Sequence, residues 1–190
     1  MSRVAFLITA VVLLFPAATS GAVGGYAFDG GTKTERATVV AALEASSFDW
    51  TLLPGPITIH IVRGEPSRSL PREVWLDADL LDSGEFAWGV VQHEYAHQVD
   101  YLLLDDAQRA LLLRELGGRD WCYSVPGLAH DQYGCERFAS TLAWSFWPSV
   151  ENSMRPTHPG DESAAMAPAR FRALVTRLTS RPLSRRSGVH

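Results

Sequence analysis

Two histidines and a glutamate stand close together in the segment His93-Glu94-Tyr95-Ala96-His97. On a helix, His93 and His97 lie on one face about one turn apart, because residues four positions apart are neighbours there. Their ring nitrogens can then reach one metal ion at about 2.0–2.1 Å, the bond length that zinc prefers. Glu94 is turned about 100° away around the helix axis, so its carboxylate can reach a water on the metal without being a ligand. The segment therefore predicts a zinc site in which Glu94 is the general base for attack of that water on a carbonyl group.

The residues around this segment favour a buried helix. Val90, Val91 and Val99 are uncharged, and no proline interrupts the stretch. The alternative interpretation is a surface helix that carries two histidines by chance, since five residues are a short motif. A buried, uninterrupted helix is the kind of element that can hold a metal site in place, so the catalytic interpretation is preferred.

Zinc in a hydrolytic site needs a third protein ligand. With its helix and the strand expected before it, the motif resembles the gluzincin branch of the zinc metallopeptidases, over roughly residues 57–147. In that branch the third ligand is a Glu on a later helix, which implies Glu136, 39 positions after His97, and one zinc ion per chain. The best-known gluzincins have Asn before this Glu and Asp further on, where this chain has Cys135 and Ser140.

Other branches of these peptidases fit less well. The metzincins require Gly at position 100 and His at position 103, where this chain has Asp100 and Leu103. The run His130-Asp131-Gln132-Tyr133-Gly134 loosely resembles the aspzincins, with the spacing off by one, so Asp131 and His130 stay open as rival third ligands. Asp100 is on the His face of its helix and is expected to hydrogen-bond a ligand histidine or to be a solvated surface residue.

Hydrolysis of a peptide also needs a donor for the oxygen that becomes negatively charged. Tyr133 and His130 are candidates because they stand near the start of the helix that carries Glu136. Each of them could equally be a packing residue, and His60 on an expected strand is interpreted as structural.

Cys122 and Cys135 are the only cysteines. In an exported chain a pair of cysteines favours a disulfide over two free thiols. Such a bond would stabilise the fold by about 3 kcal/mol in the chain-entropy model. It would also anchor the residue next to Glu136.

The two ends of the chain differ in composition from the middle. Residues 1–22 resemble a signal peptide, with Arg3 followed by an apolar run at 4–15 and small residues before the expected cleavage site; an uncleaved anchor is the alternative. Residues 23–33 are Gly-rich and are expected to be a flexible leader, and 181–190 are expected to be a disordered basic tail. We therefore expect a secreted or extracytoplasmic protein.

Between these ends we expect a single domain over residues 34–180. Helices are expected at 34–46 with Thr34 as cap, at 84–104 with a capping box of Asp82 and Glu85, at 107–116, at 133–147 and from Pro168 onward. Strands are expected at 57–62 and 73–80, with a turn at 64–71 between them and irregular chain at 149–167. The free edge of the second strand could pair with an extended peptide. The order predicts a zincin-like α+β fold: a small mixed or antiparallel sheet on the active-site helix, with a mainly helical C-terminal part.

The overall composition is that of an ordinary globular domain. Apolar residues make up 46% and charged residues 20%, and the net charge of −4 gives no reason to expect nucleic acid or an anionic membrane as partner. The expected function is a monomeric, secreted zinc metallopeptidase that acts on a peptide or protein. The alternatives are a non-catalytic, zinc-stabilised binding protein and a zinc amidase that acts on cell-wall peptides.

Overall fold

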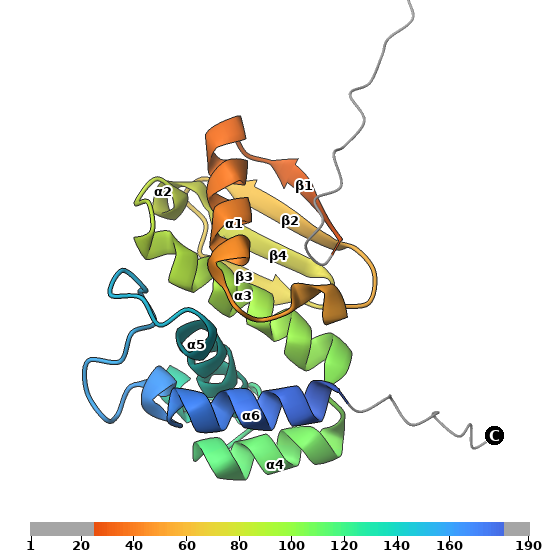
Figure 1. Cartoon of the computed structure of the whole chain (residues 1–190), viewed down its shortest axis with the longest axis vertical. Coiled ribbons are helices and arrows are strands. Elements are labelled where there is room, and N and C mark those ends of the chain that lie inside the picture. Colours follow the sequence, from red (N-terminus) through yellow and green to blue (C-terminus); the bar gives the residue numbers. More distant parts are fainter. Residues whose placement is uncertain (1–24, 181–190) are drawn as a thin grey trace, which may run out of the picture.

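The computed structural model describes residues 25–180 (Figure 1). The signal peptide expected at 1–22 and the tail expected at 181–190 lie outside these residues. Over the described part, none of the helices has the length and apolar character needed to cross a membrane.

A mixed four-stranded sheet forms one side of the molecule, in the order β1-β2-β4-β3. The strands are β1 (Tyr26–Gly30), β2 (Ile57–Val62), β3 (Arg68–Leu70) and β4 (Glu73–Asp77). β1, β2 and β4 are parallel, and β3 runs antiparallel to β4. The expected flexible leader is wrong for residues 26–30, because they pair with β2, and the expected turn at 64–71 contains β3. The strand expected at 73–80 is β4, and it ends at Asp77, where the chain turns into the short helix α2 (Ala78–Leu81).

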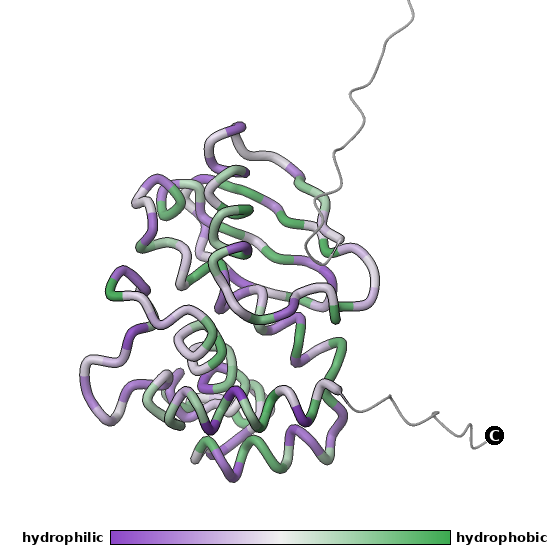
Figure 2. Tube along the Cα trace, in the orientation of Figure 1, coloured by the Kyte–Doolittle hydropathy of each residue, from purple (hydrophilic) through white to green (hydrophobic). Residues whose placement is uncertain are grey.

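One face of this sheet is buried under helices. Along β2, buried Ile57, Ile59 and Ile61 alternate with half-buried residues, as expected for a strand with one face on the core. The green segments of β2 and β4 in Figure 2 mark these hydrophobic residues. Helices α1 (Lys33–Ala45) and α3 (Phe86–Leu103) cover the core side by side, and the side-chain amide of Gln92 on α3 donates to Ala42 O of α1 at 2.7 Å.

A second group of helices packs on the other side of α3. It consists of α4 (Asp106–Leu116), α5 (Gly134–Phe146) and α6 (Pro168–Thr179), and α5 lies against α3 (Figure 1). Short 3₁₀ turns occur at η1 (Trp50–Leu52), η2 (His130–Gln132) and η3 (Glu162–Ala164). The fold is therefore α+β, with a mainly helical C-terminal part.

The helix ends follow local capping chemistry. The cap of α1 lies two residues earlier than expected, because Thr32 rather than Thr34 caps the helix in a capping box with Glu35. α4 is capped by Asp105, whose side chain accepts from Gln108 N. The capping box expected for α3 is absent, since its N-cap residue Glu85 makes no side-chain cap bond. α3 is held instead by packing, with twelve of its residues buried.

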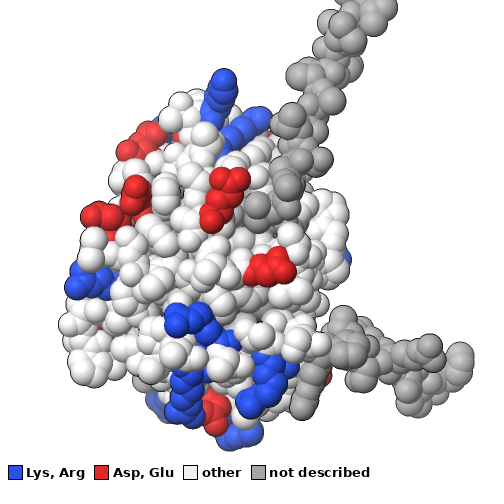
Figure 3. Space-filling view, viewed as in Figure 1, with Lys and Arg blue, Asp and Glu red and all other residues white. Residues whose placement is uncertain are grey.

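Basic side chains on the face shown in Figure 3 concentrate over the helical end, near α6 and α4, and acidic ones lie nearer the sheet and α1. Two of the arginines of α6 are engaged within the fold: Arg170 pairs with Glu115 of α4, and Arg172 donates to Ser145 O at 2.7 Å. This concentration therefore serves helix packing in part.

Candidate metal centre

His93 and His97 of α3 meet Glu136 of α5 across the helix interface. Their Nε2 atoms are 3.2 Å apart, and they lie 3.2 and 3.3 Å from Glu136 Oε2. A tetrahedral zinc ion with bonds of about 2.0 Å holds neighbouring ligand atoms about 3.3 Å apart. The three atoms thus have the mutual spacing and the donor types that one zinc ion requires. We call these three residues the ligand triangle.

The two helices approach closely because small residues line their contact. Ala139 lies one turn after Glu136 on α5 and is fully buried, as is Ala96 on α3. All three residues of the ligand triangle are buried as well. The burial of Glu136 acts to raise its pKa, but hydrogen bonds from His93 and His97 outweigh that effect and lower the pKa of the carboxyl group.

The rivals of Glu136 occupy other places. Within residues 25–180, His93, His97 and Glu136 are the histidine-containing set whose ligand atoms lie within 4.8 Å of one another. Asp131 is exposed on η2, and its main-chain oxygen accepts from Arg137. His130 reaches only one corner of the triangle, with Nε2 3.3 Å from Glu136 Oε2. Its Nδ1 bonds Glu162 at 2.5 Å, which is the main reason that the pKa of His130 is raised.

Glu94 is the fourth buried polar residue of the centre. Only 7% of its surface is exposed, and burial raises the pKa of its carboxyl group despite the nearby His93 and His97. Its carboxylate faces the same cleft as the ligand triangle. This cleft has a volume of about 340 Å³ and is lined by Ser67, Arg68, Ser69, Leu70, His93, Glu94, His97, Tyr101, Cys122, Tyr123, His130 and Glu136.

Tyr123 is a residue of the site that the sequence interpretation did not single out. Its hydroxyl donates to Glu136 Oε1 at 2.7 Å, so it holds the carboxylate oxygen that does not face the histidines. Its backbone has a positive φ of 56°, an unusual conformation for a residue with a side chain. The available signal was its position next to Cys122, because a bond from Cys122 to Cys135 brings the neighbours of both cysteines together.

Tyr133, expected as a donor to substrate, is turned away from the centre. Its hydroxyl donates to Val125 O at 2.8 Å, the residue is buried, and its ring packs on that of Tyr123 with 4.2 Å between centroids. That expectation is therefore corrected: Tyr133 supports Tyr123 from behind, and Tyr123 faces the cleft.

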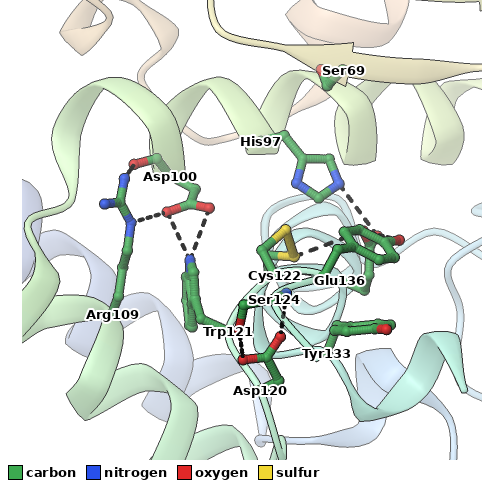
Figure 4. Close-up of a disulfide and its surroundings, with 12 residues drawn as sticks. Ser69, His97, Asp100, Arg109, Asp120, Trp121, Cys122, Ser124, Tyr133 and Glu136 are labelled. Atoms are coloured by element: carbon green, nitrogen blue, oxygen red, sulfur yellow. Dashed lines mark hydrogen bonds and ion pairs between the residues drawn. A yellow bond between two sulfur atoms is a disulfide. The ribbon is translucent and has the colours of Figure 1, made fainter. Parts of the chain in front are cut away.

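The disulfide between Cys122 and Cys135 is present in the structure, with its Cα atoms 5.5 Å apart. Figure 4 shows it between the His97–Glu136 side of the centre and a polar group around Asp100. Both alternatives expected for Asp100, a bond to a ligand histidine and a solvated position, are wrong. Its buried carboxylate accepts from Arg109 Nε at 2.7 Å and from Trp121 Nε1 at 3.1 Å, because both side chains point at it from α4 and the following loop.

β3 forms one wall of the cleft and is an outer strand of the sheet. The expected substrate edge on β4 is wrong, since β4 lies between β2 and β3. β3 is fixed to the helix below it: Ser69 Oγ donates to Glu94 O at 2.6 Å, and Gln98 Nε2 donates to Leu70 O at 2.8 Å. These bonds therefore fix the position of the edge of β3 relative to the ligand triangle.

No family model, curated protein or solved structure matches this chain.

Proposed function

We propose that this chain is a zinc-dependent peptidase of the gluzincin type, with a zincin-like fold, that acts as a monomer outside the cytoplasm. The observation that carries the proposal is the ligand triangle with Glu94 beside it. His93, His97 and Glu136 have the spacing of three zinc ligands, and a buried carboxylate that is not part of the triangle faces the same cleft.

Zinc, when bound there, would lower the pKa of a water molecule and polarise the substrate carbonyl. Glu94 is the residue that accepts the proton of this water and later passes it to the leaving amine. Its burial supports this role, because a raised pKa makes a carboxylate a stronger base.

Two side chains at Glu136 supply donors to the substrate oxygen. The Tyr123 hydroxyl and His130 Nε2 each contact one oxygen of the Glu136 carboxylate and line the cleft. A donor that is already in place before the reaction stabilises developing negative charge without having to reorganise. His130 keeps the role expected from sequence, and Tyr123 takes the one expected of Tyr133.

An extended peptide is the substrate that the cleft favours. The outer edge of β3 can pair with an added strand. Two exposed side chains with large apolar surfaces, Leu70 and Tyr123, line the cleft and are available to contact substrate residues. A structural zinc site normally has four protein ligands, whereas the triangle provides three and faces a cleft, which favours catalysis over a purely structural metal.

The test compares the wild type with Glu94→Gln, using Glu85→Gln as a matched control at the exposed start of the same helix. Zinc content and hydrolysis of a peptide library and of cell-wall fragments are measured for each protein. We expect about one zinc per chain in all three and a loss of hydrolysis by about 10²–10⁴-fold in Glu94→Gln alone. Hydrolysis that persists in Glu94→Gln, or a wild type that takes up no zinc, would overturn the proposal. Cleavage of cell-wall fragments alone would reassign the substrate to the amidase class.

A further inference from the structure

Glu162 lies between two histidines of the centre, although it comes from the Pro-rich segment at 149–167. Its Oε2 accepts from Ser140 Oγ at 2.7 Å, and Ser140 Oγ is 3.0 Å from Nδ1 of His93. Its Oε1 is 2.5 Å from Nδ1 of His130. The Glu162 carboxylate therefore contacts the expected zinc ligand His93 through the Ser140 hydroxyl, and it contacts His130 directly.

The direction of these hydrogen bonds can be worked out from the groups involved. A serine hydroxyl has one proton to donate, and the Glu162 carboxylate at 2.7 Å is a stronger acceptor than either the neutral ring nitrogen of His93 at 3.0 Å or the Met154 thioether at 3.6 Å. Ser140 Oγ must then accept from His93, which places a proton on His93 Nδ1. In a neutral imidazole with its proton on Nδ1, the lone pair that a metal needs is on Nε2, and this is the nitrogen that faces Glu136.

The position of Glu162 is itself fixed by its surroundings. Its main-chain oxygen accepts from Thr141 Oγ1 of α5 at 3.2 Å, and Glu162 is the first residue of the η3 turn. Further up the same segment, the buried amide of Asn152 donates to Ala143 O and Trp147 O at 3.1 and 2.7 Å. The segment is thus tied to α5 at two points, and 19% of the Glu162 side chain is exposed.

We propose that Glu162 is a positioning residue that holds His93, through Ser140, in the tautomer and ring orientation that a zinc ligand needs, and that orients His130 directly. This inference rests on the proposed function. Carboxylates that fix a ligand histidine through its second nitrogen raise metal affinity, and their removal costs about 10–100-fold in affinity or activity. In this chain the Glu162 carboxylate would act on His93 through the Ser140 hydroxyl and on His130 by a direct hydrogen bond.

The experiment measures the zinc dissociation constant of the purified protein by competition with a chromophoric chelator. Glu162→Gln, Ser140→Ala and the double variant are compared with the wild type. The matched control is Glu151→Gln, an exposed glutamate of the same segment. We expect Glu162→Gln and Ser140→Ala each to weaken zinc binding by about 10–100-fold. The double variant should be no weaker than the worse single variant, because both changes break one path.

A spectrum separates positioning from general loss of stability. The absorption bands of bound Co²⁺ report the geometry of its ligands, so we expect them to change in Glu162→Gln and Ser140→Ala and to stay unchanged in Glu151→Gln. If Glu162→Gln does not fold, Ser140→Ala, which removes one hydroxyl, must still give the affinity loss and the altered spectrum.

Equal zinc affinity in the wild type, Glu162→Gln and Ser140→Ala would overturn this inference and leave the zinc site intact. Losses that add in the double variant would also overturn it, since Glu162 would then act by another path. A wild type that binds no zinc would overturn the proposed function as well, and this outcome is distinguishable because it precedes any comparison of variants.

Discussion

Glu136 and Asp131 are five positions apart, yet only one of them faces the histidines. Glu136 is buried with Oε2 at 3.2 and 3.3 Å from the two Nε2 atoms, whereas Asp131 is exposed. We predict that Glu136→Ala lowers zinc affinity by at least about 100-fold, a larger effect than loss of a residue that only supports a ligand. Asp131→Ala, the matched control, should bind zinc like the wild type. Chelator competition measures both, and the reverse order would place Asp131 in the site.

The two tyrosines at the centre allow a similarly direct comparison. Tyr123→Phe removes the hydroxyl that faces the cleft, and we expect kcat at saturating zinc to drop by about 10²–10³-fold. Because the same hydroxyl holds Glu136 Oε1, we also expect zinc affinity to fall by about 10–100-fold. Tyr133→Phe removes only the bond to Val125 O, so we expect kcat to be kept and the free energy of unfolding to drop by about 1 kcal/mol. Steady-state kinetics and urea titrations measure these effects. Equal kcat values for the two variants would argue against a catalytic role for Tyr123.

Among the site residues, those related by local spacing along one helix could be predicted from the sequence. Those that join the site only through tertiary contacts could not. The relation of His93, Glu94 and His97 follows from the helix repeat. The contacts of Tyr123 and Glu162 with the centre depend on how two loops fold back on α5, and no spacing along the chain encodes that.

Gln98 joins the edge strand to the helix that carries the histidines. It is fully buried, its Nε2 donates to Leu70 O at 2.8 Å, and its Oε1 accepts from Arg72 N at 2.7 Å. Gln98→Leu would leave Leu70 O of β3 and Arg72 N of the following turn without these partners. We predict a loss of about 1–3 kcal/mol in the free energy of unfolding and a raised KM for peptides. Urea titration and kinetics measure the two effects; an unchanged free energy would mean that pairing with β4 and the contacts of Ser69 with α3 hold β3 without Gln98.

The helices and strands also fall into those that the sequence predicted and those that it did not. The strand at 57–62, the long helix around the motif and the helix from Pro168 were predicted because each has a clear hydrophobic period or a strong end signal. β3 was missed because it has only three residues, and β1 because it lies in a Gly-rich stretch. Their pairing partners rather than their own composition make them strands. The capping box expected for α3 did not form, since packing on both sides of that helix outweighs a local cap.

The disulfide ties the loop that carries Tyr123 to the start of α5. Its two cysteines are separated by 13 positions, and closing a loop of that size is worth about 3 kcal/mol. We predict that the double variant Cys122→Ser/Cys135→Ser loses about that much unfolding free energy. It should also bind zinc more weakly, because Cys135 is next to Glu136. Urea titration and chelator competition test this, and full zinc affinity in the variant would show that α5 needs no such anchor.

α3 lies between the sheet with α1 on one side and α5 on the other, and twelve of its eighteen residues are buried. A growing chain that has reached only residue 104 would expose the side of α3 that α5 covers, so the first half cannot become a finished folding unit on its own. The last ligand, Glu136, arrives only with the helix that completes this burial. On the proposed function, the chain would gain the ability to cut peptides only once its own segments are folded and protected, which would limit self-digestion during its synthesis.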